Sequence, residues 1–367
     1  STYNPFTRTL LFTAETGSPS GGVIEITTGW PAQVRRLDGV FGSAGFEGIH
    51  PDNRGNIIVI EDAGGTSVNV IPGDTTSPKV ARQPNSFVYR LLPYNRRDLS
   101  KGGKLQALQV SIDGSAVVFN ASDPSGDVFS TAQLKLHTPG SSYPFTWITV
   151  HDTAVDGTAA FDANAAAKTA GATPFKRPEN AQFLPGSNFR TFFFDPTGDT
   201  NADSGNQPAL ASRGAWGSIF RVDQSEDRET GMISIFVLGD ADHSSFDNLT
   251  FADGHTLLAA EDRGDGLHTQ LNKLDSVWSF FLDGSAPTRF VALGRDAAAE
   301  TDASLAGTAG FQNEGDNEPT GLHVSIGSAS VSGLPGTLNN LNHPRAFLTR
   351  QHGENVTWEI VKRGRDR

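Results

Sequence analysis

Acidic residues recur at matching places in two stretches of the chain. Residues 46–62 read FEGIHPDNRGNIIVIED and residues 246–262 read FDNLTFADGHTLLAAED, and Glu47 precedes Glu61 by the same 14 residues that separate Asp247 from Glu261. Each copy places an acid before a turn and two acids after an apolar strand. This matching spacing indicates an internal repeat, and equivalent acids meet in space if the repeats surround one axis.

The repeat defines two sets of acidic positions whose shared chemistry is metal binding. Carboxylates crowded at one mouth repel one another unless a cation neutralises them. Their hard oxygens select Ca²⁺, Mg²⁺ or Mn²⁺ over zinc or copper, so we expect a metal site, with Ca²⁺ first. The alternative is that these acids cap turns and face solvent. The first-strand set is Glu47, Glu179, Asp247 and Glu318, and the strand-end set is Glu15, Glu61 with Asp62, Asp195, Glu261 with Asp262, and the segment QHGEN at residues 351–355.

One basic residue accompanies these acids. In KRPEN, residues 176–180, Arg177 precedes Glu179 by two positions. On an extended segment the two side chains share a face. The planar guanidinium binds phosphate oxygens in pairs. Two interpretations stay open, namely a phosphate site beside a metal cluster and a local Arg–Glu ion pair.

The elements that must position these residues are short strands. The chain has 367 residues with 40 Gly and 20 Pro, which favours turns over long helices. Units of three or four strands recur and predict an all-β fold, a single six-bladed β-propeller over residues 1–367, or a five-bladed one if the terminal pieces combine. The weakest unit covers residues 113–176. Within it, Ala-rich residues 152–174 break the strand rhythm and are expected to form a helical insertion on one face.

Composition excludes several classes of protein. The net charge of −12 argues against nucleic-acid binding, and the absence of cysteine excludes thiolate catalysis, zinc-thiolate sites and disulfides. No apolar run approaches the roughly 20 residues of a membrane span. The acidic excess and a start at STYNPF without an initiator Met favour a processed chain that is periplasmic or secreted. We expect a monomer.

Several motifs together resemble the PhoX-type alkaline phosphatases. They are EGI…NRGNIIVIEDAGG, FVYRLLPYNRRDLSKGGKLQAL, RPENAQFLPG, DNLTF…LLAAED, NEPTGL and QHGEN, spread over residues 46–355. The resemblance implies a six-bladed propeller, a metal cluster in its central channel, and hydrolysis of phosphate esters outside the cytoplasm. It implies that Arg177 holds the phosphate and that the metal ligands are Glu47, Glu61, Glu179, Asp247 and Glu318. Glu261 occupies the position in the repeat that is equivalent to Glu61, so we expect it to be a metal ligand as well.

The family pattern also bears on the cofactor. PhoX-type phosphatases carry a mixed iron and calcium cluster in which a cysteine helps to hold the irons, and this chain has no cysteine. We therefore expect Ca²⁺, with Fe or Mn as alternatives and without the family's di-iron site.

The predicted function is metal-dependent hydrolysis of a small anionic phosphate ester. One alternative is a calcium-dependent lactonase or esterase, whose acid or base would be one of several histidines. Another is a non-catalytic binding propeller that calcium stabilises. Trp147, just before the insertion, is a candidate for stacking on the substrate, with blade packing as the alternative. The histidines considered are His50, His151, His255 and His352.

Overall fold

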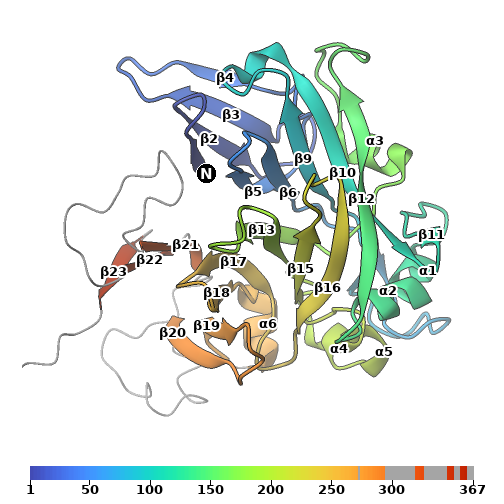
Figure 1. Ribbon diagram of the computed structural model, residues 1–367. Coiled ribbons are helices and arrows are strands. Elements are labelled where there is room, and N and C mark those ends of the chain that lie inside the picture. The colour runs from blue at the N-terminus through green and yellow to red at the C-terminus, as the bar shows by residue number, and fades with distance from the viewer. Residues whose placement is uncertain (272, 294–318, 326–344, 351–355, 362–367) are drawn as a thin grey trace, which may run out of the picture.

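In the computed structural model of the protein, the residues described are 1–271, 273–293, 319–325, 345–350 and 356–361 (Figure 1). Most of its regular structure is antiparallel β-sheet. The strands fall into five groups that follow the chain. They are β1 (Thr2–Asn4), β2 (Thr9–Ala14), β3 (Gly22–Thr27) and β4 (Val34–Arg36); β5 (Phe46–Pro51), β6 (Ile57–Glu61), β9 (Val88–Pro93) and β10 (Gly103–Ile112); β13 (Pro178–Phe183), β14 (Thr191–Pro196), β15 (Ser218–Gln224) and β16 (Thr230–Leu238); β17 (Phe246–Phe251), β18 (Thr256–Glu261), β19 (Asp275–Phe281) and β20 (Thr288–Leu293); and β21 (Pro319–Ser325), β22 (Arg345–Arg350) and β23 (Thr357–Val361).

The inner strands of these groups lie side by side. Strand β5 contacts β2 on one side and β13 on the other, β13 contacts β17, and β17 contacts β21. Each group then leads outward through hairpins, as the blades of a propeller do. The all-β, propeller-like fold predicted from the sequence is therefore confirmed. The described strands supply five groups, and a count of six blades stays a prediction.

The predicted unit over residues 113–176 does not form a group of its own. Its long strand β12 (Ser142–Asp152) pairs with β10 on one edge and with β16 on the other. The second and third groups thereby join into one continuous sheet of ten strands, one of which is the short β11 (Ser115–Ala116) paired with β10 at the side. The sequence correctly predicted a strand in this region, but that strand, β12, pairs with the outer strands of two neighbouring groups.

The hydrophobic core lies between successive groups, and the central strands face it on both sides. In β6, Ile57 and Val59 pack toward the first group, whereas Ile58 and Ile60 pack toward the third. Strand β18 is divided in the same way between its two neighbours. Burial of both faces explains why these strands read as unbroken apolar runs rather than as alternating patterns.

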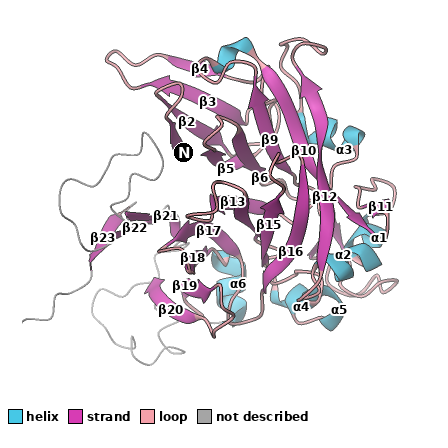
Figure 2. Cartoon of the chain, viewed as in Figure 1, coloured by secondary structure: helices cyan, strands magenta, loops and turns pink. Residues whose placement is uncertain are grey.

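The helices are short, and most of them lie beside the long outer strands. Figure 2 shows most of them beside β10, β12 and β16. Helix α3 (Ala163–Ala170) lies inside the predicted insertion of residues 152–174, and its Ala163 and Ala167 are buried in the core of the first two groups. In the described part of the chain no helix is long and apolar enough to cross a bilayer. The remaining elements are β7 (Ser67–Val68), β8 (Ala81–Arg82), η1 (Leu99–Lys101), α1 (Pro124–Val128), α2 (Thr131–Leu136), α3 (Ala163–Ala170), α4 (Ala202–Gly205), α5 (Pro208–Ala211) and α6 (Gly264–Leu271).

Candidate metal centre

A β-bulge occurs in the inner strand of four groups, and in three of them it contains the first acid of the sequence repeat. A bulge turns the extra residue out of the regular alternation and is common beside active sites. Glu47, Glu179 and Asp247 lie inside three of these bulges, and Thr320 occupies the fourth. The shifts in pairing lie between Phe46 and Ile49, between Pro178 and Ala181, between Phe246 and Asn248, and between Pro319 and Gly321.

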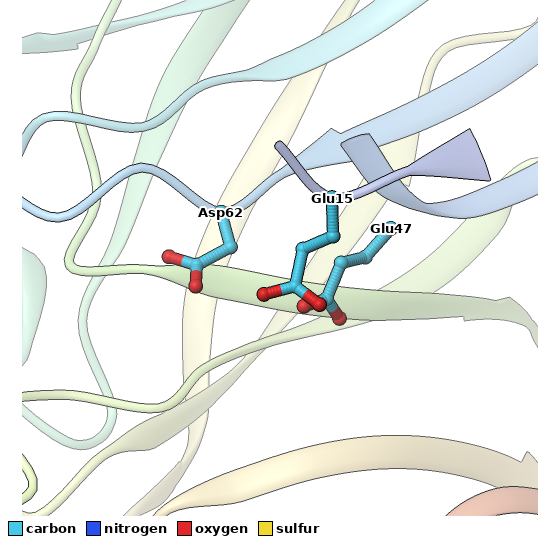
Figure 3. A group of neighbouring side chains, drawn as sticks. All are labelled: Glu15, Glu47 and Asp62. Atoms are coloured by element: carbon cyan, nitrogen blue, oxygen red, sulfur yellow. The ribbon is translucent and has the colours of Figure 1, made fainter. Parts of the chain in front are cut away.

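Five carboxylates meet at this end of the inner strands. One ligand oxygen each from Glu15, Glu47 and Asp62 lies within 4.8 Å of the others, and the same holds for Glu47, Glu179 and Asp247. Glu47 belongs to both groups and joins them. Figure 3 shows the first three carboxylates gathered on one side of their strands. We call these five residues the acidic cluster.

The carboxylates of the acidic cluster lie close together and are partly shielded from solvent. Glu179 and Asp247 are buried, Glu47 and Asp62 half-buried, and Glu15 exposed. Burial, followed by repulsion from Glu179 and Asp247, raises the pKa of Glu47 well above its usual value. Burial and the charge of Asp62 do the same to the pKa of Glu179. Such a set favours either protons or a cation, and carboxylate oxygens alone fit a hard divalent ion such as Ca²⁺.

Arg177 lies against the acidic cluster in a strained conformation. Its φ of 53° is in the left-handed region, which is unfavourable for arginine and is concentrated at functional sites. Its Nη2 donates to Asp62 Oδ2 at 2.8 Å and lies 3.4 Å from Glu179 Oε1, while Nε donates to both oxygens of Asp62. Burial opposes its charge, but Glu179 and Asp62 outweigh burial and raise its pKa. Nη1 forms no hydrogen bond within the described residues and can bind an anion.

A line of hydrogen bonds orients Asp247 from three inner strands. His50 Nε2 donates to Asn180 Oδ1 at 2.9 Å, Asn180 Nδ2 donates to Asn248 Oδ1 at 2.8 Å, and Asn248 Nδ2 donates to Asp247 Oδ1 at 2.5 Å. Burial lowers the pKa of His50 to about 4, so its ring is neutral. Such supporting contacts fix the direction of a ligand carboxylate.

Glu61 and Glu261 are not brought into the acidic cluster. Both are fully buried at the ends of their strands, where their oxygens accept hydrogen bonds from neighbouring segments. Burial raises the pKa of Glu61 to about 8. The structure gives these two residues a role in joining strands, and the expectation that they bind metal is not supported. The donors to Glu61 are Phe87 N, Tyr89 OH and Asn164 Nδ2, and those to Glu261 are Ser244 N, Ser276 N and Arg263 Nη2.

The other candidates from the sequence lie elsewhere. Trp147 is buried in the core against Phe145, with the Arg90 guanidinium 4.8 Å from its ring, which is the blade-packing alternative. His151 stacks on Phe161 at 3.9 Å, and no histidine of the described ranges belongs to the acidic cluster. Glu318 and His352 lie outside the described residues.

Part of the chain matches a known protein family. The family described as alkaline phosphatase PhoX matches residues 82–325, more than half of the chain. The chain belongs to the PhoX alkaline phosphatase family. This confirms the resemblance noted in the motifs. The matched region contains Arg177, Glu179 and Asp247. Glu15, Glu47 and Asp62 precede it and are joined to the PhoX region by the geometry of the acidic cluster.

One solved structure supports a fold like that of PhoX. Pseudomonas fluorescens PhoX in complex with vanadate, a transition state analogue, matches with a TM-score of 0.52 and 14% identity over 90% of this chain and 52% of that chain. A puromycin-hydrolyzing peptidase of Mycobacterium tuberculosis matches with a TM-score of 0.28 and 10% identity over 95% of this chain and 45% of that chain. The chain thus spans about half the length of these proteins. No curated protein matches it.

Sequence reasoning missed the residues that support the acidic cluster. His50 is predicted only as an acid or base, and neither Asn180 nor Asn248 is predicted to support a metal ligand. Both asparagines directly follow a bulged acid, in EN and DN, and this repeated pair is a signal that could have identified them. Lys176 was also missed. It forms a buried ion pair with Asp199 at 2.9 Å, next to the strained Arg177.

Proposed function

We propose that the protein is a metal-dependent phosphoric ester hydrolase whose reaction takes place at the acidic cluster. The observation that carries the proposal is the convergence of Glu47, Glu179 and Asp247 from three bulged inner strands, with Arg177 beside them. Membership of the PhoX family supports the same class of chemistry. That the protein acts outside the cytoplasm as a monomer stays a prediction.

The acidic cluster would hold the cation. Glu47, Glu179 and Asp247 form one three-carboxylate group, and Glu15 and Asp62 extend it toward the mouth. We propose Ca²⁺, because every ligand is a carboxylate oxygen and the chain has no cysteine. When bound, a divalent cation neutralises phosphoryl oxygens and lowers the pKa of a coordinated water.

The chain's own residues bind and orient the phosphate ester. Arg177 is anchored on Asp62 through Nε and Nη2, so its Nη1 is directed by a fixed guanidinium plane. A fixed donor of this kind stabilises charge on the phosphoryl oxygens without having to reorganise. The net charge of −12 and the carboxylates of the acidic cluster disfavour the approach of an anionic ester to a centre that holds no cation. Productive binding at this centre therefore depends on the bound cation.

The test is hydrolysis of p-nitrophenyl phosphate before and after EDTA, followed by add-back of Ca²⁺, Mn²⁺ or Fe²⁺ in separate samples. We expect turnover that EDTA abolishes and that Ca²⁺ restores. Hydrolysis that is insensitive to EDTA would contradict the proposed role of the metal. Absence of turnover with every ion would contradict the phosphatase proposal and favour a binding propeller.

A further inference from the structure

A second concave site lies at the opposite end of the same blade from the acidic cluster. It is a pocket of about 350 Å³ formed by the turn between β5 and β6 and by the turn after β9. Strand β5 begins beside Glu47, so its turn at residues 52–56 is at the far end. Because Ile57 pairs with Leu91, the end of β9 reaches the same end of the sheet. The pocket is therefore separate from the proposed centre.

The pocket concentrates positive charge in a chain whose net charge is −12. Arg54, Arg96 and Arg97 line it together with the neutral polar side chains of Asn56, Tyr94 and Asn95, and no carboxylate does. Within the described ranges none of the three arginines forms an ion pair with an acid. At longer range Arg54 does act on Asp227, whose pKa is lowered first by the hydrogen bond from Glu229 N and further by the Arg54 charge. Guanidinium groups that line one cavity without a direct ion-pair partner attract an anion.

Two of the three arginines are held in place. Arg54 donates from Nη1 to the Asp227 carbonyl at 3.1 Å and from Nη2 to the Glu226 carbonyl at 3.0 Å, which uses two of its five N–H groups. The Arg96 guanidinium lies 5.0 Å from the centre of the Phe6 ring. Fixing a guanidinium beforehand reduces the entropy lost when it binds a ligand.

Gly55 allows the two turns to approach. Its φ is +90°, and a Cβ on it would lie 2.8 Å from Arg96 Cβ. The residue is thus suited both to the left-handed turn and to the contact that brings Arg96 beside Arg54.

We propose that this pocket binds a phosphate group, either inorganic phosphate or the phosphate of an organic ester. Guanidinium forks bind phosphate oxygens in pairs, and three of them around a small cavity favour a compact dianion. The cavity suits one such group rather than an extended peptide. The inference concerns a site distinct from the acidic cluster and does not depend on the proposed hydrolase activity.

The test is calorimetric titration of the full chain in EDTA, with inorganic phosphate in one arm and phenylphosphonate, whose C–P bond is stable, in the other. The variant is Arg96→Gln with Arg97→Gln, both exposed positions. The matched control is Arg289→Gln, since Arg289 is exposed and lies 5.1 Å from the centre of the Trp278 ring. We expect binding by the wild type and the control, and affinity at least about tenfold weaker in the double variant.

The two arms identify the source of the phosphate group. Tighter phosphate binding indicates the free ion, and tighter phenylphosphonate binding indicates an ester. The proposal is overturned if the wild type binds neither ligand, if the double variant binds as the wild type does, or if the control loses affinity equally. Turnover of p-nitrophenyl phosphate with Ca²⁺ is measured separately, so a failure of the hydrolase proposal is told apart from a failure of the pocket.

Discussion

Replacing Glu47 with glutamine should make the protein more stable than the wild type in EDTA and less stable than the wild type in excess Ca²⁺. Glu47 shares both three-carboxylate groups, and its ligand oxygen lies within 4.8 Å of those of Glu179 and Asp247. Two unit charges at that distance repel by about 3 kcal/mol at an effective dielectric constant of about 20. For a chain of 367 residues this energy corresponds to about 4 °C in melting temperature.

The sign of the effect depends on pH. The folded-state pKa of Glu47 is raised above the usual 4.5, so ionisation lowers stability as the pH rises from 4.5 through the raised pKa. Glutamine removes this loss. At pH 8 in EDTA the Glu47→Gln variant should therefore melt about 4 °C above the wild type, within the order of magnitude of the Coulomb estimate.

In excess Ca²⁺ the wild type should melt at a higher temperature than the Glu47→Gln variant. A ligand at 100 times its Kd stabilises the folded state by about 2.7 kcal/mol, and the variant lacks the carboxylate that joins the two groups. The assay is thermal unfolding at pH 8, in EDTA and in excess Ca²⁺. Glu61→Gln is the control, because Glu61 lies outside the acidic cluster and should keep the wild-type calcium shift. A Glu47→Gln variant that is less stable than the wild type in EDTA would show that Glu47 is not repelled by its neighbours, and one that keeps the full calcium shift would show that Glu47 is not a calcium ligand.

Three further predictions concern the residues around the acidic cluster. Arg177→Gly suits the left-handed backbone and removes the guanidinium, so it should lower kcat/KM for p-nitrophenyl phosphate by about 100-fold while the fold is kept, and unchanged kinetics would exclude the anion-binding role. His50 has a folded-state pKa of about 4 against the usual 6.5, so its neutral ring stabilises the fold fully above pH 6.5, and this stabilisation is lost as the pH falls toward 4. The His50→Gln variant should therefore lose less unfolding free energy than the wild type between pH 7 and pH 5, as measured by urea unfolding. Equal losses in the two proteins would contradict this prediction. Asn180→Ala interrupts the hydrogen bonds that lead to Asp247 and should weaken calcium affinity by about tenfold in calorimetry, whereas an unchanged Kd would leave the line without a function.

The sequence predicted the repeat well because repetition does not depend on knowing the tertiary contacts. Glu47 and Asp247 occupy equivalent positions in two similar hairpins, and the structure brings both into the acidic cluster. The unbroken apolar run of β6 likewise identified a strand that is buried on both faces.

Other features depend on contacts that periodicity does not encode. A bulge moves Glu47 out of the regular alternation, whereas Glu61 at the end of the next strand finds backbone and side-chain donors instead. Spacing alone could not separate these two roles. The pairing of β12 with β10 and β16 is set by strands far apart in the chain, so a region that reads as a blade becomes a bridge between two groups.

Whether the acidic cluster is a metal centre can be determined by measuring the metal content of the purified protein. Wild-type protein and a Glu47→Gln, Glu179→Gln double variant would be dialysed against Ca²⁺, freed of unbound ion and analysed by inductively coupled plasma mass spectrometry. We expect bound calcium in the wild type and its loss from a folded double variant. Equal calcium in both proteins, or none in the wild type, would contradict it.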